Sequence, residues 1–262
     1  MESQTPQVSN QKRKIVIIPT YNERDNIVDL IEEIFQFVPD ITVLVIDDNS
    51  PDQTAFYVKK LQSAYQRLKL IERPGKLGLG TAYKLGFKYA LDHDYDYIME
   101  MDADFSHDPA VLENFFLNIE KNDLVIGSRY IRGGRLVNWP LTRWLLSYLA
   151  SIYVRLVTGL PIRDTTAGFK CFKKEVLKSI NLREIMSEGY SFQIEMHYQA
   201  WKNGWRIKEI PITFVDRSAG QSKMSYKIIW EAFLTPWKLR LQPVYNYIKQ
   251  EGFRFDLEDI DL

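Results

Sequence analysis

Short runs of β-branched and aliphatic residues alternate with stretches of helical periodicity, and this alternation constrains the fold more than any other feature. Residues 14–19, 42–46, 68–72 and 124–128 are strand-like runs. Helices are expected between them at 27–38, 53–67, 81–91 and 109–121. Strands that alternate with helices favour a mainly parallel sheet with helices on both faces. The sequence therefore predicts an α/β fold of the Rossmann-like kind.

A further strand-like stretch, residues 97–109, contains two acids separated by one small residue. Alternate side chains of a strand share a face, so Asp102 and Asp104 are expected to point the same way, and Ala103 leaves room for a ligand near the backbone. Two carboxylates placed like this can hold a divalent cation that bridges to a diphosphate. The alternative is a solvated turn, because Asp, Ser and Pro favour turns.

Polar residues also follow two other expected strands, at 19–23 and 47–50. Ligands of such sheets lie beyond the carboxyl ends of the strands, so these clusters and residues 102–104 are expected to converge on one crevice. Convergence favours a catalytic site. The glycines at 75, 78 and 80 either let backbone amides approach a phosphate or simply open a helix. They are not the dinucleotide fingerprint, which follows the first strand.

Composition limits the classes of function. The 262 residues suffice for one sizeable core, and 34 Lys and Arg residues balance 34 Asp and Glu residues, which argues against broad nucleic-acid binding. Cys171 is the only cysteine, so an intrachain disulfide is impossible and a reducing, cytoplasmic compartment is expected. Residues 144–154, the most apolar candidate span, are shorter than the roughly 20 residues that a membrane span needs.

The chain divides into four expected parts. Residues 1–13 are polar and lack the apolar core of a signal peptide, so they are expected to be a disordered tail. Residues 14–225 are the expected catalytic domain, residues 226–255 an aromatic and basic extension, and residues 256–262 an acidic tail.

Several motifs together resemble the family 2 glycosyltransferases of the GT-A fold. They are the strand-end clusters and the segments GLGTAY (78–83), GSRY (127–130), GYSFQIEM (189–196) and VDRSAGQSK (215–223). In this order they are similar to the dolichyl-phosphate mannosyltransferases, or polyprenol monophosphomannose synthases, over residues 14–235. The resemblance implies transfer of mannose from GDP-mannose to a polyprenyl phosphate, with inversion at the anomeric carbon and with Mg²⁺ or Mn²⁺ as cofactor.

The resemblance also implies roles for individual residues. Asp104 is the implied principal metal ligand, and Asp102 lies beside it. Ser106 stands where some members have Gln, and its hydroxyl is a weaker metal ligand. Arg129, Arg143 and Ser147 are implied to face the acceptor phosphate. Arg217 and Lys223 are implied to close over the donor. The guanosine is implied to contact Pro19, Tyr21, Glu23, Ile46 and Asp48, and the sugar-nucleotide site to be lined by Asp102 and Ala103.

The implied reaction needs no strong general base. A phosphate monoester has a second pKa of about 6, so the acceptor is mostly a dianionic nucleophile at neutral pH. Catalysis is then expected from Asp104, Arg129, Arg143 and Arg217, through positioning of the acceptor and stabilisation of the departing GDP by the metal and by Arg217 or Lys223. The histidines at 93, 107 and 197 are expected to be structural or exposed.

Two aromatic-rich segments are candidates for contact with a membrane. Residues 139–159 mix aromatic, aliphatic and arginine residues as an interfacial helix does, and an ordinary core helix is the alternative. Residues 226–248 suit a headgroup boundary or a membrane-anchoring partner protein, or else pack on the core. We therefore expect a peripheral enzyme on the cytoplasmic face of a membrane, the endoplasmic reticulum in a eukaryote or the inner membrane in a bacterium.

Two other functions are compatible with these residues. A polyprenyl-phosphate glucosyltransferase that uses UDP-glucose would need the same acids. A non-catalytic sugar-nucleotide-binding subunit would keep the crevice without the chemistry. The intact acids and arginines argue against the second alternative.

Overall fold

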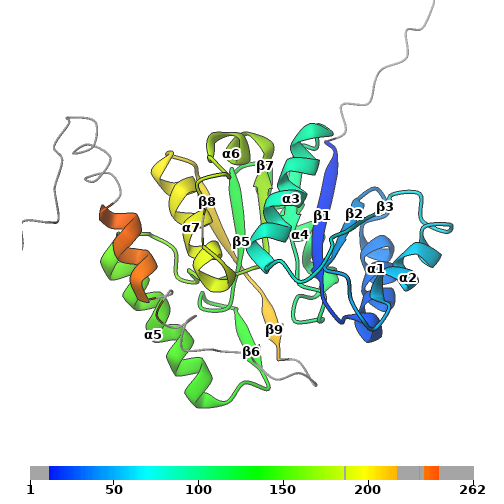
Figure 1. Cartoon of the computed structure of the whole chain (residues 1–262). Coiled ribbons are helices and arrows are strands. Elements are labelled where there is room, and N and C mark those ends of the chain that lie inside the picture. Colours follow the sequence, from blue (N-terminus) through cyan, green and yellow to red (C-terminus); the bar gives the residue numbers. More distant parts are fainter. Residues whose placement is uncertain (1–11, 186, 217–229, 231–232, 242–262) are drawn as a thin grey trace, which may run out of the picture.

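A seven-stranded sheet forms the centre of the molecule in the computed structural model, which describes residues 12–185, 187–216, 230 and 233–241 (Figure 1). The strand order is β3-β2-β1-β4-β7-β5-β8. The strands are β1 (Lys14–Thr20), β2 (Thr42–Asp47), β3 (Leu68–Glu72), β4 (Tyr97–Glu100), β5 (Leu124–Ser128), β7 (Lys170–Lys173) and β8 (Ile207–Pro211). All neighbouring strands pair in parallel except β7, which is antiparallel to both β4 and β5. The predicted mainly parallel sheet is confirmed.

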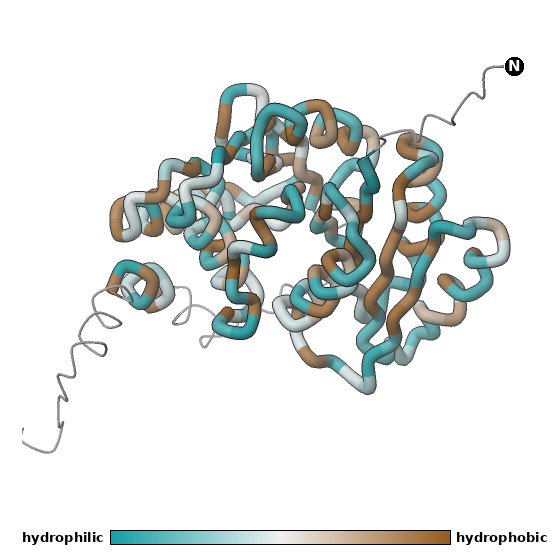
Figure 2. The backbone as a smooth tube through the Cα atoms, turned by 90° about the horizontal axis from the view of Figure 1, so that it is seen from above, coloured by the Kyte–Doolittle hydropathy of each residue, from teal (hydrophilic) through white to brown (hydrophobic). Residues whose placement is uncertain are grey.

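Helices cover both faces of the sheet, as the alternation predicted. One face carries α1 (Arg24–Phe37), α2 (Thr54–Leu61), the 3₁₀ turn η1 (Pro109–Val111) and α4 (Leu112–Ile119). The other carries α3 (Leu79–Asp92), α6 (Lys174–Ser179) and α7 (Gly189–Lys202). Successive residues of β1 serve opposite faces: Val16 and Ile18 join the first core cluster, and Ile15 and Ile17 join the second. Strands buried on both faces must be apolar throughout, and they appear mostly brown in Figure 2.

Beyond the sheet lie a small two-stranded ribbon and a long helix. Strand β6 (Arg135–Val137) pairs in parallel with β9 (Thr213–Val215), and α5 (Leu141–Thr158) follows β6. Helical residues 233–241 run beside the C-terminal half of α5 (Figure 1), where Val154 and Leu239 share a small apolar cluster with α7. Within the described part of the chain, no helix is both long and apolar enough to cross a membrane.

The N-terminal half of α5 carries an exposed apolar surface. Its large hydrophobic side chains from residue 141 to residue 149 are at least 37% exposed, and they are Leu141, Trp144, Leu145, Leu146, Tyr148 and Leu149. The buried residues of α5 are Ser151, Val154 and Thr158, all in its C-terminal half. The core-helix alternative therefore describes only the second half of α5.

Several predicted boundaries are wrong. Strand β4 ends at Glu100, so Asp102 and Asp104 lie on a loop and not on a strand. Helix α2 ends at Leu61 rather than at residue 67, and the helix expected at 109–121 is a 3₁₀ turn followed by α4, which ends at Ile119. Lys12 and Arg13, assigned to the tail, contact Asp96, so the ordered domain begins before residue 14. Residues 1–11 and 242–262, with most of the predicted extension, lie outside the described residues.

Candidate active site

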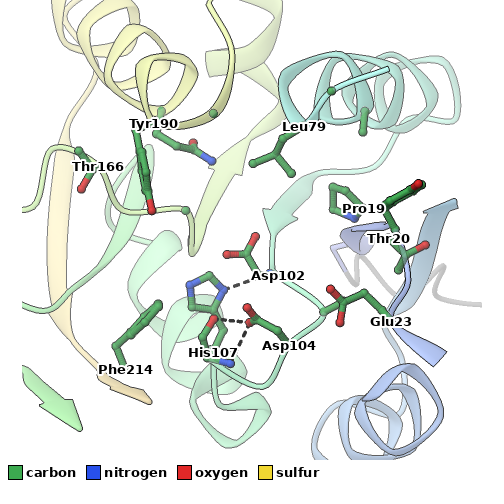
Figure 3. Close-up of a pocket in the computed structure, with 18 of the residues that line it drawn as sticks. Pro19, Thr20, Glu23, Leu79, Asp102, Asp104, His107, Thr166, Tyr190 and Phe214 are labelled. Carbon is green, nitrogen blue, oxygen red and sulfur yellow. Dashed lines mark hydrogen bonds between the residues drawn. The ribbon is translucent and has the colours of Figure 1, made fainter. Parts of the chain in front are cut away.

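The predicted crevice is a pocket of about 380 Å³ beyond the carboxyl ends of β1, β2 and β4. The chain turns there because each of these strands ends in polar residues that leave the sheet. In Figure 3 the carboxylates of Asp102 and Asp104 lie in the middle of the pocket, with Glu23 on one side and Phe214 on the other. The predicted site residues that line it are Pro19, Tyr21, Glu23, Asp48, Asp102, Ala103, Asp104, Ser106, Arg129 and Arg143.

A hydrogen-bonded loop, rather than strand pleating, holds the two central acids. Phe105 adopts a left-handed backbone with φ of 57° and reverses the chain after Asp104. The backbone N–H and the hydroxyl of Ser106 then donate to Asp104 Oδ1 at 3.1 and 2.5 Å. The backbone N–H of Asp102 donates to His107 Nδ1 at 3.1 Å. Both carboxylates therefore face the pocket through local turn geometry.

His107 is a structural residue of the site. It is buried, stacks on Phe169 with ring centroids 4.6 Å apart, and accepts through Nδ1 from the backbone of Asp102. Burial lowers the pKa of His107, so the ring stays neutral and Nδ1 stays an acceptor. The sequence expectation of a structural histidine holds, and the structure adds that it fixes the first of the two acids.

The acids fit a cation that is shared with a diphosphate. Among the described residues, no three His, Cys, Asp or Glu side chains gather as a metal site. Mg²⁺ commonly takes one or two carboxylates and fills its other positions with water and substrate phosphate oxygens. Asp102 and Asp104 supply that number of carboxylates. Ser106 donates its hydroxyl hydrogen to Asp104, and the lone pairs of its oxygen stay available to a cation.

Arg129 is held rigidly at the wall of the pocket. Asp164, fully buried, accepts from Arg129 Nε at 2.7 Å and from Nη2 at 2.6 Å, and Thr166 accepts a further bond from Nη2 at 2.9 Å. Burial opposes the charge, but the Asp164 carboxylate overcomes it and raises the pKa of Arg129. Arg129 is therefore a fixed cation with a built-in counter-charge.

Arg143 approaches from α5 and forms a second ion pair. Its Nη1 donates to both carboxylate oxygens of Asp216, at 2.7 and 2.6 Å, and its guanidinium lies over the Trp139 ring at 4.3 Å. Trp139, Arg143 and Asp216 all line the same pocket as the acids. Asp216 and Trp139 were not singled out from the sequence.

At the opposite end of the pocket, Asp48 is tied to a cation that the sequence reading missed. Arg73 Nε donates to Asp48 Oδ1 at 2.5 Å, and both side chains are less than 10% exposed. The backbone N–H of Leu77 donates to the second oxygen of Asp48 at 3.0 Å, and Lys76 lies over the Tyr21 ring at 4.2 Å. The sequence could have indicated Arg73, because this residue directly follows β3, just as the polar clusters directly follow their strands.

A buried charged cluster lies behind the acids. Glu100 and Lys170 are fully buried, with Lys170 Nζ 3.8 Å from Glu100 Oε2, and Lys170 also donates to Gln193, which lines the pocket. Burial raises the pKa of Glu100 to about 7 and lowers that of Lys170 to about 8. The segment 189–196 also contributes Tyr190 to the pocket wall, so this motif reaches the site.

Some predicted site residues do not line the pocket. Ile46 of β2 is fully buried in the core on the α3 face of the sheet and does not line the pocket. Ser147 lies one turn beyond Arg143 on α5 but is not among the lining residues. Arg217 and Lys223 lie outside the described residues, and their implied roles stay predictions.

Sequence comparison places the chain among known enzymes. Residues 15–180 match the family described as "Glycosyl transferase family 2". An undecaprenyl-phosphate mannosyltransferase of Micrococcus luteus is 42% identical over 229 residues, which are 87% of this chain and 94% of that protein. A polyprenol monophosphomannose synthase of Mycolicibacterium smegmatis is 42% identical over 233 residues, 87% of this chain and 88% of that protein.

Solved structures share the fold at low sequence identity. Glucosyl-3-phosphoglycerate synthase from Mycobacterium tuberculosis, in complex with Mn²⁺, UDP and glucosyl-3-phosphoglycerate, matches with a TM-score of 0.58 and 16% identity, over 94% of this chain and 82% of that chain. A mannosyltransferase from Pyrobaculum calidifontis, in complex with GDP-Man and Mn²⁺, matches with a TM-score of 0.54 and 16% identity, over 94% and 77% of the two chains. With its α/β sheet, its acid-centred pocket and these relatives, the chain belongs to glycosyltransferase family 2 and has the GT-A fold.

Proposed function

We propose that the protein transfers mannose from GDP-mannose to a polyprenyl phosphate, with inversion at the anomeric carbon and with Mg²⁺ or Mn²⁺ as cofactor. The observation that carries the proposal is the distribution of charge in one pocket, with Asp102 and Asp104 at its centre and Arg129 and Arg143 on its wall. The names of the two 42% identical relatives support mannose as the sugar and a polyprenyl phosphate as the acceptor. The GDP-Man complex of the Pyrobaculum relative supports the donor.

The acids and the arginines have different roles in the proposed reaction. When bound, the divalent cation neutralises the donor diphosphate and stabilises the departing GDP. Asp102 and Asp104 hold that charge in place, and the His107 ring fixes the backbone of Asp102. Arg129 and Arg143 attract the acceptor phosphate, whose oxygen attacks the anomeric carbon from the side opposite the leaving group. Because the acceptor arrives as a dianion, none of the side chains has to remove a proton.

The acceptor is a lipid, and the exposed surface of α5 supports its delivery from a membrane. The leucine and aromatic side chains of residues 141–149 lie on the helix that carries Arg143. Side chains of this kind settle at the boundary between headgroups and acyl chains. A peripheral position on a membrane would therefore bring the lipid phosphate to Arg143 without removing its isoprenoid chain from the bilayer.

The proposal is tested by a transfer assay. The purified chain is incubated with Mg²⁺ or Mn²⁺ and a short polyprenyl phosphate, with labelled GDP-mannose or labelled UDP-glucose, and label is counted in the organic extract. We expect label from GDP-mannose, and at least about a hundredfold less with Asp104→Asn at saturating metal. Label from UDP-glucose alone would make the chain a glucosyltransferase, and full activity of Asp104→Asn would refute the role of the acids.

The control is a charge-neutralising change of the same type away from the pocket. Asp123 pairs with Lys173 and Arg206 and is not among the residues lining the pocket, so Asp123→Asn should transfer at the wild-type rate. Loss of nucleotide from the wild-type protein on chelation, measured by calorimetry, separates metal-dependent donor binding from a metal effect on chemistry alone.

A further inference from the structure

The cation proposed to receive the acceptor phosphate already holds an anion of the protein. Arg143 Nη1 donates to Asp216 Oδ1 at 2.7 Å and to Oδ2 at 2.6 Å. The two side chains are 32% and 20% exposed, so solvent and ligands reach the pair from the pocket. A carboxylate thus occupies Nη1, one of the guanidinium nitrogens that a bidentate phosphate contact would use.

Neighbouring contacts hold this pair at a defined place. Asp216 directly follows β9, and its backbone N–H donates to the carbonyl of Val137 on β6 at 3.0 Å. Trp139 lies under the guanidinium of Arg143 at 4.3 Å. The ribbon therefore fixes the backbone of Asp216, while its side chain can rotate away from Arg143 without breaking the β6–β9 ladder.

We propose that Asp216 is an internal competitor for the acceptor phosphate and sets the affinity of Arg143 for anions. This inference rests on the proposed function, since the ligand is the acceptor named there. The carboxylate carries one negative charge and two acceptor oxygens, whereas a phosphate monoester carries a charge of about −1.5 to −2 and three acceptor oxygens. The monoester therefore displaces the carboxylate. The ion pair with Asp216 raises the apparent dissociation constant of every anion that binds Arg143, and by the same factor.

That factor matters at a membrane surface, where phosphate groups are abundant. Phosphodiesters of bulk lipids are monoanions, so they gain little over the carboxylate already in place. The acceptor monoester has more charge and is also attracted by the fixed Arg129 guanidinium, which lines the same pocket. Asp216 is thus expected to keep weakly bound phosphates off Arg143 while the acceptor still binds.

The opposite role for Asp216 is a positioning one, in which its carboxylate orients Arg143 toward the phosphate. The two roles predict changes of opposite sign. Removing a competitor tightens phosphate binding, whereas removing an orienting partner weakens it. Asp216→Asn keeps the shape of the side chain and removes its charge, and Asp216→Ser provides a second variant that cannot reach Arg143 in the same way.

The test is calorimetric binding of farnesyl phosphate and of inorganic phosphate without donor. We expect Asp216→Asn and Asp216→Ser to bind both anions about three- to tenfold more tightly than the wild type, as expected for loss of a partly exposed ion pair. In an Arg143→Gln background, Asp216→Asn should leave the affinity unchanged, because the contact is already absent. Asp123→Asn, which breaks an ion pair elsewhere, should leave phosphate affinity unchanged.

Unchanged or weaker phosphate binding in folded Asp216 variants would overturn the inference, as would an effect that persists in the Arg143→Gln background. Absence of measurable phosphate binding in both the wild type and the variants would overturn it as well. The binding assay contains no donor, so its result is separate from that of the transfer assay. A wild-type protein that binds farnesyl phosphate but transfers no mannose refutes the proposed function alone.

Discussion

Replacing Asp164 by Asn should destabilise the protein by about 3 kcal/mol, because the change leaves a buried cation without its counter-charge. The Asp164 side chain is fully buried, and that of Arg129 is 7% exposed. The carboxylate accepts from the backbone N–H, Nε and Nη2 of Arg129. An amide of the same shape carries no charge and turns an N–H group toward these donors.

The magnitude follows from what is lost and what remains. Removing one partner of a buried ion pair typically destabilises by about 3–5 kcal/mol. A value at the lower end is expected because the rings of Tyr130, Trp139 and Phe214 stay within 5.2, 5.6 and 5.4 Å of the guanidinium. For a chain of this size, such a loss lowers the melting temperature by about 6–12 °C.

Urea unfolding followed by circular dichroism measures this loss. Asp92→Asn is the matched control, since Asp92 and its partner Lys88 are 54% and 71% exposed and the expected loss is below about 1 kcal/mol. The paired replacement Arg129→Met with Asp164→Asn, whose amide oxygen can still accept from the backbone N–H of residue 129, should recover part of the stability and still abolish transfer. If Asp164→Asn unfolds within about 0.5 kcal/mol of the wild type, the Arg129 charge is solvated through the pocket and the reasoning is refuted.

Three further outcomes are expected. His197→Asn should lessen the loss of stability in acid. Burial lowers the pKa of His197, so below about pH 6.5 the unfolded chain binds a proton that the folded chain does not. The free energy of unfolding of the wild type therefore falls as the pH drops through this range. Melting temperatures between about pH 5 and 7 test this, and equal slopes would contradict it. Gly134→Ala should lower stability by about 2–3 kcal/mol, because the new Cβ would lie 2.7 Å from two backbone carbonyl oxygens, and an unchanged melting temperature would exclude this overlap. Leu145→Ser and Leu149→Ser should each weaken sedimentation with anionic vesicles about tenfold, whereas Leu117→Ser on α4, at a residue still more exposed to solvent, should not; no difference between α5 and α4 variants would argue against membrane contact through α5.

Three strands of the sheet were readable because they are buried on both faces. Residues 14–19, 42–46 and 124–128 are mostly apolar runs, and the structure has β1, β2 and β5 within one residue of these bounds. Helix ends were less readable, as α2 shows by ending at Leu61, since short helices are decided by tertiary contacts more than by their own sequence.

The antiparallel strand β7 could not be foreseen from periodicity. It is inserted between β4 and β5, although residues 129–169, which include β6 and α5, separate it from β5 along the chain. Its four residues, Lys170–Lys173, include a lysine that is fully buried against Glu100. A lysine in a sequence predicts an exposed position, so only the fold shows that this strand lies in the centre of the sheet.

The sequence by itself determined the α/β class, the family resemblance and the place of the polar clusters, because strand ends and turns depend on short segments of the chain. The tertiary structure decided which charges meet. Arg129 and Asp164 are 35 residues apart, and Arg143 and Asp216 are 73 residues apart. Pairs of this separation depend on how the ribbon, α5 and the loop before β7 pack against the sheet. The fold of the pocket therefore decides whether an arginine is buried in an ion pair, paired with a competing carboxylate or exposed. No local sequence pattern shows this.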